Sequence, residues 1–437
     1  MIKRLLLTTS LSLLIAGSCL AQIITLEPKK IDEEVKKEEP KKILIINKTN
    51  TAPVIDGRID EPLWKDAAKA GNFLINDERR IPAKAQTTVY LTYDNKNLYI
   101  GFHCDEPYID KIKARITEHD GPVWEDDCVE VFIDSNNDEI TYYHFMVNSK
   151  GVNADEINDL RKEFIKKHDL SWESNLITKS FIGKDFWSTE LAIPLKKISP
   201  LKRNDIWRIN LNRERKVVEE NSCWSYLVKR FHQPKRFGYL AFKGEEYTIT
   251  NVLFPSFAYG DNPIKLKIRN EDNTTRKVKL NVHKKSLLTE IPSGEEKEVT
   301  VYFKAEKDGK LSVSLSHPKS NKLYYLFSKE FSIPPLMTVS LRNKLLFAGE
   351  EDTLSADINL GISSISLKDT KLRVILEKNK KILTRKKFEK ITSPQLILSI
   401  NTTKMAPGKY TLSVDLLNKK EKILSSHREN FEIIEGY

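Results

Sequence analysis

The sequence predicts an all-β protein, with one larger antiparallel β-sandwich on its N-terminal side and two smaller β-sandwiches after it. Residues 128–133 and 142–148 each alternate between two kinds of side chain, as in a β-hairpin with one face in a core. After residue 244, short alternating segments are separated by stretches rich in Asn, Asp, Pro and Gly. Hydrophobic residues make up 40% of the 437-residue chain, enough for several packed cores.

The charge of the chain does not indicate a nucleic-acid partner. The formal net charge is +11, but the 72 basic and 61 acidic residues are interspersed along the sequence. No basic stripe with interleaved aromatic residues occurs, so the excess is expected to form a solvated, lysine-rich surface.

The first 21 residues have the pattern of a secretion signal, with Lys3 and Arg4 before an apolar run that is too short to span a membrane. Cleavage after Ala21 would give a soluble exported protein. Cleavage before Cys19 would instead give a lipidated protein, and a membrane partner is expected only in that case. Residues 22–42 are rich in charge and poor in apolar side chains, which predicts a disordered linker, with order beginning near Ile43.

The hairpin within residues 124–151 carries the chemistry of most interest. Its core-facing side is apolar, and its other side displays Trp124, carboxylates, a histidine and an amide. Carboxylates and amides bind hydroxyl groups, and an indole covers the apolar C–H face of a sugar ring. This mixture predicts a ligand rich in hydroxyls.

Residues 43–244 resemble a family 9 carbohydrate-binding module. The hairpin carries the resemblance, and five further segments follow the family's order: residues 55–61 with Trp64, 89–104, 207–213, 223–225 and 231–242. Residues 153–174 are charged and less regular, which predicts a loop with a helix. The resemblance implies an antiparallel β-sandwich that binds a polysaccharide or oligosaccharide.

The resemblance also implies site residues. Trp124 and Trp224 would hold a sugar between two indoles, with Glu130, Asn221 and Arg213 around the rim. The family's arginine on the second hairpin strand is replaced by Met146, and His144 on the same face is a further candidate. The competing interpretation places both tryptophans in the core, where large aromatic residues usually lie.

Asp126 and Asp127 open the first strand of the hairpin and allow two interpretations. They hold the local turn, or they bind a structural calcium ion, which prefers oxygen ligands. No cofactor is required for sugar binding. The spacing of three cysteines, Cys104, Cys128 and Cys223, fits no zinc pattern. An exported protein permits one disulfide, whose pair the sequence does not indicate; the alternative expectation is that at least two are small buried residues.

The predicted function is that of an exported, non-catalytic carbohydrate-binding protein that supports glycan degradation by partner glycoside hydrolases. Catalysis by Glu125, Asp126, Asp127 and Glu130 is disfavoured, because neighbouring strand residues point to opposite faces. Residues 245–335 and 336–437 are predicted to be immunoglobulin-like sandwiches without a catalytic cluster. The alternative function is a surface adhesin that binds protein through these two domains.

Overall fold

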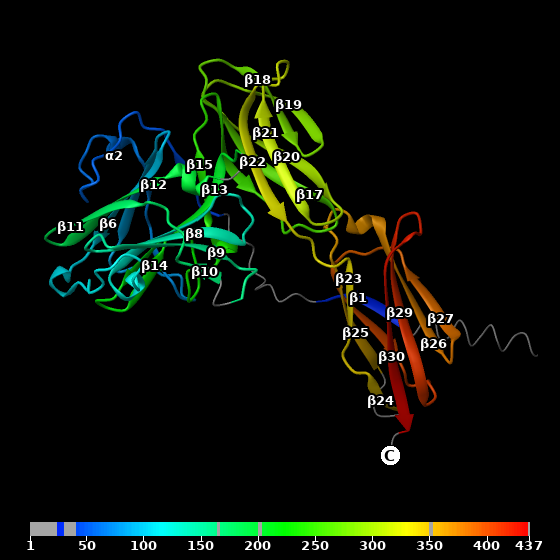
Figure 1. Ribbon diagram of the computed structural model, residues 1–437. Helices are drawn as coiled ribbons and strands as arrows, with labels where there is room; N and C mark the ends of the chain where they lie inside the picture. Colours follow the sequence, from blue (N-terminus) through cyan, green and yellow to red (C-terminus); the bar gives the residue numbers. More distant parts are fainter. Residues whose placement is uncertain (1–23, 30–40, 164–166, 200–202, 349–352, 436–437) are drawn as a thin grey trace, which may run out of the picture.

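The computed structural model describes residues 24–29, 41–163, 167–199, 203–348 and 353–435. The described part is almost entirely β-structure, in several separate sheets, which confirms the predicted fold class (Figure 1). No described helix has the length and apolar character needed to cross a membrane. The predicted signal and Cys19 lie outside the described residues.

The N-terminal module, residues 41–245, contains two sheets. The larger has nine strands: β2 (Ile43–Ile46), β4 (Leu74–Ile75), β7 (Cys128–Asp134), β8 (Thr141–Asn148), β9 (Asn153–Asp159), β10 (His168–Asp169), β13 (Ile206–Arg215), β14 (Glu220–Cys223) and β15 (Gly238–Phe242). The smaller has five: β3 (Ala68–Ala70), β5 (Thr87–Tyr93), β6 (Asn97–Asp105), β11 (Ile177–Ile182) and β12 (Phe186–Pro194). The described residues of the module also form two one-turn α-helices, α2 (Leu63–Asp66) and α4 (Leu195–Ile198).

The pairing in the larger sheet is antiparallel except where β2 pairs with β15 in parallel. Its order runs β10-β9-β8-β7-β13-β14-β4. The core of the module lies between the two sheets and includes Val131, Phe145, Trp187 and Trp207. The segment from residue 153, expected to be a loop with a helix, instead begins with β9, so this expectation is corrected.

The segment at residues 55–64 has a structural role. Glu190 on β12 accepts hydrogen bonds from the backbone N–H groups of Asp56 and Gly57, at 3.0 and 2.9 Å, and from Trp64 Nε1 at 3.1 Å. Gly57 has φ of +92°, and a Cβ there would lie 2.5 Å from the Ser180 carbonyl carbon. The turn therefore requires glycine. Trp64 is 2% exposed, so it is a core residue of the module.

The middle sandwich packs directly against the module. Its sheets are β16 (Tyr247–Leu253), β17 (Gly260–Asn270) and β20 (Glu296–Ala305), and β18 (Arg276–Val282), β19 (Lys285–Ile291), β21 (Gly309–Ser316) and β22 (Leu323–Phe331). Its hydrophobic cluster also takes in Ile206, Tyr239 and Ala241 from the module. The two parts therefore share a packed contact, because side chains of β13 and β15 fill the base of the middle sandwich.

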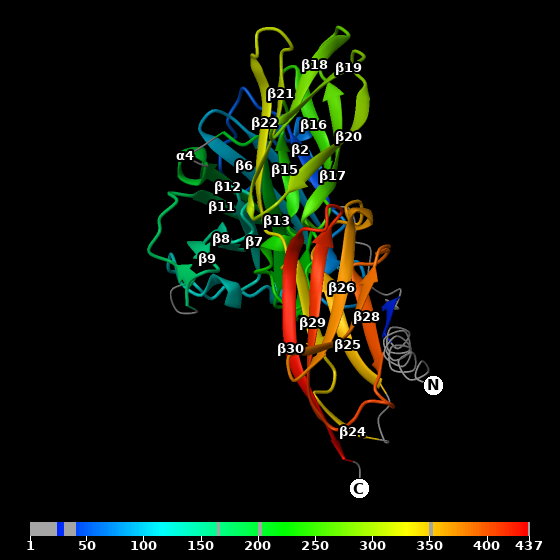
Figure 2. The same cartoon turned by 90° about the vertical axis from the view of Figure 1, so that its right-hand side faces the viewer.

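The C-terminal sandwich includes a strand from the other end of the chain. Its sheets are β1 (Ile24–Pro28), β23 (Met337–Leu341), β25 (Thr353–Leu360) and β28 (Gln395–Asn401), and β24 (Leu345–Ala348), β26 (Thr370–Lys378), β27 (Lys381–Phe388), β29 (Gly408–Asn418) and β30 (Ile423–Glu435). In Figure 2 the blue β1 lies at the edge next to β28, with Ile24 opposite Ile400. The predicted linker over residues 22–42 is thus corrected at residues 24–28, where Ile24 is fully buried.

Candidate functional site

The outer face of the larger sheet, on the side away from the module core, carries the polar side chains. Val129, Val131 and Ile133 of β7 point into the core. By alternation, Cys128, Glu130, Phe132 and Asp134 point to the outer face. All seven residues of β7 are nevertheless buried, so this outer face is also covered.

Two covers lie on this face. At one end, Val123 of the turn η2 (Val123–Glu125) clusters with Cys128, Met146 and Ala154. At the other end, residues of the 224–237 loop cluster with two aromatic side chains of the sheet; the members of this cluster are Phe132, Tyr142, Cys223, Leu227, Phe231 and Phe237. The strip between the covers is polar.

A row of titratable side chains, called here the polar row, crosses this strip from strand to strand. It consists of Glu214 on β13, Glu130 on β7, His144 on β8 and Glu156 on β9. His144 Nε2 lies 2.8 Å from Glu130 Oε2, and its Nδ1 lies 2.9 Å from Glu156 Oε1. The imidazole also stacks on Phe132, with ring centroids 3.9 Å apart.

The row holds its charges by close pairing. Burial alone would lower the pKa of His144, but hydrogen bonds to Glu130 and Glu156 raise it to about 9. Burial would raise the pKa of Glu156, yet the bond to His144 holds it well below its usual range. Burial and the charge of Glu130 raise the pKa of Glu214 to about 7. His144 therefore lies as an imidazolium between two carboxylates at neutral pH.

Asn212 lies in the same strip without a hydrogen-bond partner. It pairs with Glu130 in the register of β13 and β7, and it is fully buried. Within the described part of the chain, neither its Oδ1 nor its Nδ2 has a hydrogen-bond partner. A buried amide in this state costs about 1–3 kcal/mol unless a water or a ligand group meets it.

Of the predicted site residues, Trp124 is the exposed one. It belongs to η2, whose neighbour Val123 packs on the outer face, and its side chain is 42% exposed. Its indole is available to a ligand at the rim of the strip. Asn221 on β14 is opposite Glu214 in the register, so it shares this face and is partly buried.

Trp224 does not form the second wall of the predicted site. It is 4% exposed and belongs to the core between the two sheets. A Cβ on Gly238 would lie 2.6 Å from its Cζ3, which shows how closely the backbone packs on the indole. The two tryptophans therefore lie on opposite sides of the larger sheet, and the expected pair of facing indoles is corrected.

Arg213 is also on the core side, two residues from Leu211 in the same strand. Its Nη2 donates to Glu106 Oε2 at 3.0 Å, and Arg215 donates to the same carboxylate at 2.7 Å from both Nε and Nη2. Arg213 is 1% exposed and Glu106 is fully buried. The predicted rim position of Arg213 is corrected: it is part of a buried ion pair that ties the two sheets together.

Glu130 and His144 lie on the predicted face of the sheet, but their hydrogen-bonding groups are already engaged with each other and with Glu156. Both are nearly fully buried, and the two ring nitrogens of His144 are bound to carboxylates. The expectation that His144 binds a sugar directly is therefore wrong, because both of its ring nitrogens already contact carboxylates.

Asp126 and Asp127 hold turns. Asp126 accepts the backbone N–H groups of Arg115 and Ile116, at 2.8 and 2.9 Å, and Asp127 accepts those of Lys113 and Lys216, at 2.7 and 3.0 Å. A cation would have to displace these donors, so the pair does not fit a calcium site well. Structural calcium stays an untested prediction. Cys104, Cys128 and Cys223 are free and buried, as expected for small core residues.

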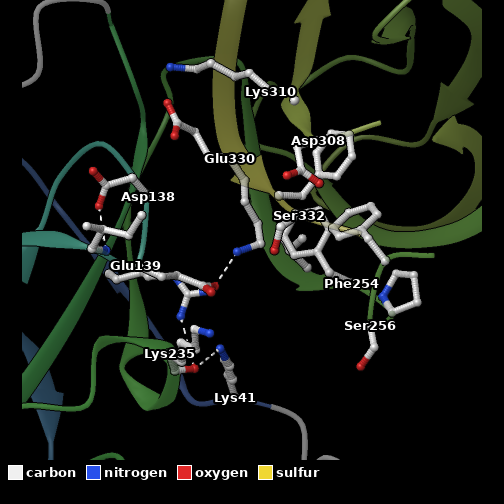
Figure 3. A pocket seen from close by; sticks show the side chains of 18 of the residues that line it. Lys41, Asp138, Glu139, Lys235, Phe254, Ser256, Asp308, Lys310, Glu330 and Ser332 are labelled. Atoms are coloured by element: carbon white, nitrogen blue, oxygen red, sulfur yellow. Dashed lines mark hydrogen bonds and ion pairs between the residues drawn. The ribbon is translucent and has the colours of Figure 1, made fainter. Parts of the chain in front are cut away.

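A separate cavity of about 880 Å³ lies at the joint between the module and the middle sandwich (Figure 3). Glu139 lies at its wall and pairs with Arg208 of the module and Lys329 of the middle sandwich. Burial would raise the pKa of Glu139, but these two cations lower it. The cavity thus marks an ionic joint between two parts of the chain.

Sequence reasoning missed four side chains of the polar strip: Glu156, His168, Glu214 and His232. Glu156 carried no local signal, because apolar and polar residues do not alternate regularly over residues 153–159. His232 lies in a loop that only tertiary packing brings over the sheet, so the sequence carried no signal for it.

The N-terminal module matches a family model, and part of the chain is similar to known proteins. The family model described as carbohydrate family 9 binding domain-like matches residues 55–245. Exoglucanase XynX from Acetivibrio thermocellus is 30% identical over 105 residues, which are 24% of this chain and 8% of that enzyme. A family 9 carbohydrate-binding module from Caldicellulosiruptor kristjanssonii, solved with cellotriose, is 17% identical, with a TM-score of 0.35 over 46% of this chain and 94% of that one. A family 9 module from the same organism, solved with glucose, is 18% identical, with a TM-score of 0.34 over 46% of this chain and 96% of that one. The family match assigns a carbohydrate-binding domain-like segment to the module.

Proposed function

We propose that this is an exported carbohydrate-binding protein, and that its module holds a sugar at the outer face of the larger sheet, beside Trp124. One observation carries this proposal: an indole that is 42% exposed stands at the rim of a polar strip. The match of residues 55–245 to a carbohydrate-binding domain family supports the same ligand class.

The chemistry of the strip suits a sugar. The indole of Trp124 covers one apolar C–H face of the ring, and hydroxyl groups reach the acids and amides beside it. Asn221 and Glu214 are partly exposed groups of that face, and Glu130 and Asn212 lie deeper. Asn212 offers both a donor and an acceptor that lack partners among the described residues. With one indole wall instead of two, the affinity should be modest, on the order of micromolar to millimolar.

The module is proposed to bind without catalysis. A glycosidase needs two carboxyl groups free to address one bond. Asp126 and Asp127 are occupied by backbone N–H groups, and Glu130 is bound to His144. Hydrolysis of a bound glycan is therefore assigned to partner enzymes, and the soluble or lipidated form of the N-terminus decides whether binding takes place at a membrane.

A glycan array with the full chain, followed by calorimetry on the glycans it retains, tests this function. Trp124→Ala should abolish measurable binding and leave the unfolding midpoint nearly unchanged, because the indole is exposed. Tyr302→Ala is the matched control, since Tyr302 is 48% exposed but belongs to the middle sandwich. Loss of binding with Tyr302→Ala but not Trp124→Ala would refute the proposed site, and hydrolysis of a retained glycan would refute the non-catalytic role.

A further inference from the structure

At one end of the polar row, His144 and Glu156 meet a second histidine, His232, in a largely buried cluster. His144 of β8 and Glu156 of β9 are 3% and 5% exposed, and His232 comes from the loop that covers the sheet. One ligand atom from each of the three lies within 4.8 Å of the other two. We propose that His144, Glu156 and His232 form a binding site for a divalent transition-metal ion, with Zn²⁺ as the best match.

The distances are close to those of a metal site. With Zn–N bonds of about 2.0–2.1 Å in a tetrahedron, ligand atoms lie roughly 3.3 Å apart. Loop-borne His232 is the side chain with the freedom to close the difference, because β8 and β9 are paired strands. A shift of this loop that keeps the contact with Tyr142 then completes a three-ligand set.

The donor set selects the class of ion. Two imidazoles and one carboxylate suit zinc and its first-row neighbours, whereas calcium and magnesium prefer oxygen ligands. Three protein ligands leave a fourth position. His168 lies beside it, with Nδ1 3.1 Å from Glu156 Oε1 and its ring centroid 5.0 Å from that of His232. Its side chain is 30% exposed, so an ion can approach from the solvent along this side.

Both histidines have outer partners of the kind that orient metal ligands. Glu130 lies 2.8 Å from His144 Nε2, which directs Nδ1 toward Glu156. The Tyr142 hydroxyl lies 2.8 Å from His232 Nδ1, which leaves the other ring nitrogen for an ion. A carboxylate or hydroxyl on the second nitrogen fixes the orientation of a metal-bound imidazole. An ion pair between His144 and its two carboxylates would not require His232, nor the contact between His232 and the Tyr142 hydroxyl.

The alternative is that His144, as an imidazolium between Glu130 and Glu156, satisfies the cluster without metal. The full chain, stripped with chelator, is therefore titrated with Zn²⁺ by calorimetry and with Co²⁺ by visible absorption. The proposal expects one ion per chain at this site, with the intense visible bands of four-coordinate cobalt. Absence of binding, or only the weak bands of six-coordinate cobalt, would overturn it.

Variants assign the site. His232→Ala should weaken binding at least tenfold, and its melting temperature in chelator measures the separate cost of losing the contact with Tyr142. If that variant misfolds, Glu156→Gln keeps the shape and should also weaken binding at least tenfold. Glu130→Gln, which alters an outer partner, should cost about 10–100-fold.

A second, exposed group is the matched control. His119 lies near Asp120 and Asp155, also within 4.8 Å, but its side chain is 47% exposed. His119→Ala should leave the tight binding intact. Binding that survives His232→Ala and Glu156→Gln but is lost with His119→Ala would overturn the proposal. All these readouts are of metal binding, so they do not depend on whether the module binds glycans.

Discussion

At the scale of single residues, burial separates two tryptophans that the sequence pattern treats alike. Trp124 is 42% exposed and Trp224 is 4% exposed, although both occupy positions that resemble a sugar-binding pair. Alternation along a strand predicts on which side of the sheet a side chain lies, but it does not predict which segments cover that side. The exposed role could therefore be predicted for Trp124, and the core role of Trp224 could be offered only as the competing interpretation.

Trp224→Ala should destabilise the module by about 3–5 kcal/mol, because removing a buried indole leaves a cavity. Urea unfolding followed by tryptophan fluorescence measures this well. All six tryptophans of the chain lie between residues 64 and 224, so the signal reports the module alone. Trp124→Ala should change the same free energy by less than about 1 kcal/mol. Equal losses in the two variants would contradict the assignment of Trp224 to the core.

Glu214→Gln should alter the dependence of stability on pH. The folded pKa of Glu214, about 7, is above its ordinary value of 4.5, because the side chain is buried beside Glu130. Its stabilising contribution is thus fully present below about pH 4.5 and is lost as the pH rises through 7, by at most about 3 kcal/mol. The amide of the variant mimics the protonated acid at every pH, by donating to Glu130.

Unfolding free energies at pH 5 and pH 8 test this expectation. Relative to Glu214→Gln, the unmodified protein should lose about 2–3 kcal/mol between the two values. The pairing with Lys216 is already contained in the pKa of Glu214, because this cation lowers it. Glu219→Gln is the control, since Glu219 is 76% exposed, and its profile should run parallel to that of the unmodified protein. A parallel profile for Glu214→Gln would contradict the prediction.

At the scale of elements, regular alternation was predictable and charged strands were not. The hairpin of β7 and β8 follows from its sequence, because alternating apolar residues face the core. β9 was missed because Asp155 and Glu156 make its sequence look like a loop. Both are buried only because a serine and two histidines meet them: Ser174 N–H donates to Asp155, and His144 and His168 bind Glu156. Such pairing between distant segments leaves no local signal.

Ile24→Ala should destabilise the C-terminal sandwich by about 2–5 kcal/mol, because Ile24 of β1 is fully buried in its core. Hydrogen exchange of β28, the partner strand of β1, should rise in this variant. Thr25→Ala is the control, since Thr25 is exposed, and it should leave the exchange unchanged. Fluorescence-detected unfolding of the module should be the same in both. Unaltered exchange in Ile24→Ala would show that β1 adds nothing to the sandwich.

At the scale of the whole molecule, the sequence predicted three sandwiches in order, and the structure adds two long-range connections. One is β1, which joins the C-terminal sandwich from the start of the described chain. The other is the joint at the module, where the Tyr325 hydroxyl lies 2.9 Å from the carbonyl oxygens of both Asp205 and Phe242. Composition and turn signals mark segment ends, but they do not state which surfaces meet. The middle sandwich is therefore expected to move together with the module.

The ionic joint gives the sharpest test of that expectation. Glu139 pairs with Arg208, which is 1% exposed, and with Lys329, which is 8% exposed. Glu139→Gln removes the carboxylate that contacts both buried cations, so it should cost about 3–5 kcal/mol and loosen the joint. Lys329→Met should cost less, because Glu139 keeps Arg208. The double variant, Glu139→Gln with Lys329→Met, should recover part of the loss of Glu139→Gln, since one of the two cations is gone.

Hydrogen exchange of β22 and small-angle scattering would detect the loosened joint. Lys310→Gln removes an exposed cation of the same cavity and should change neither measurement. Additive losses in the double variant would mean that the two side chains are not coupled and that the apolar contacts alone hold the middle sandwich in place.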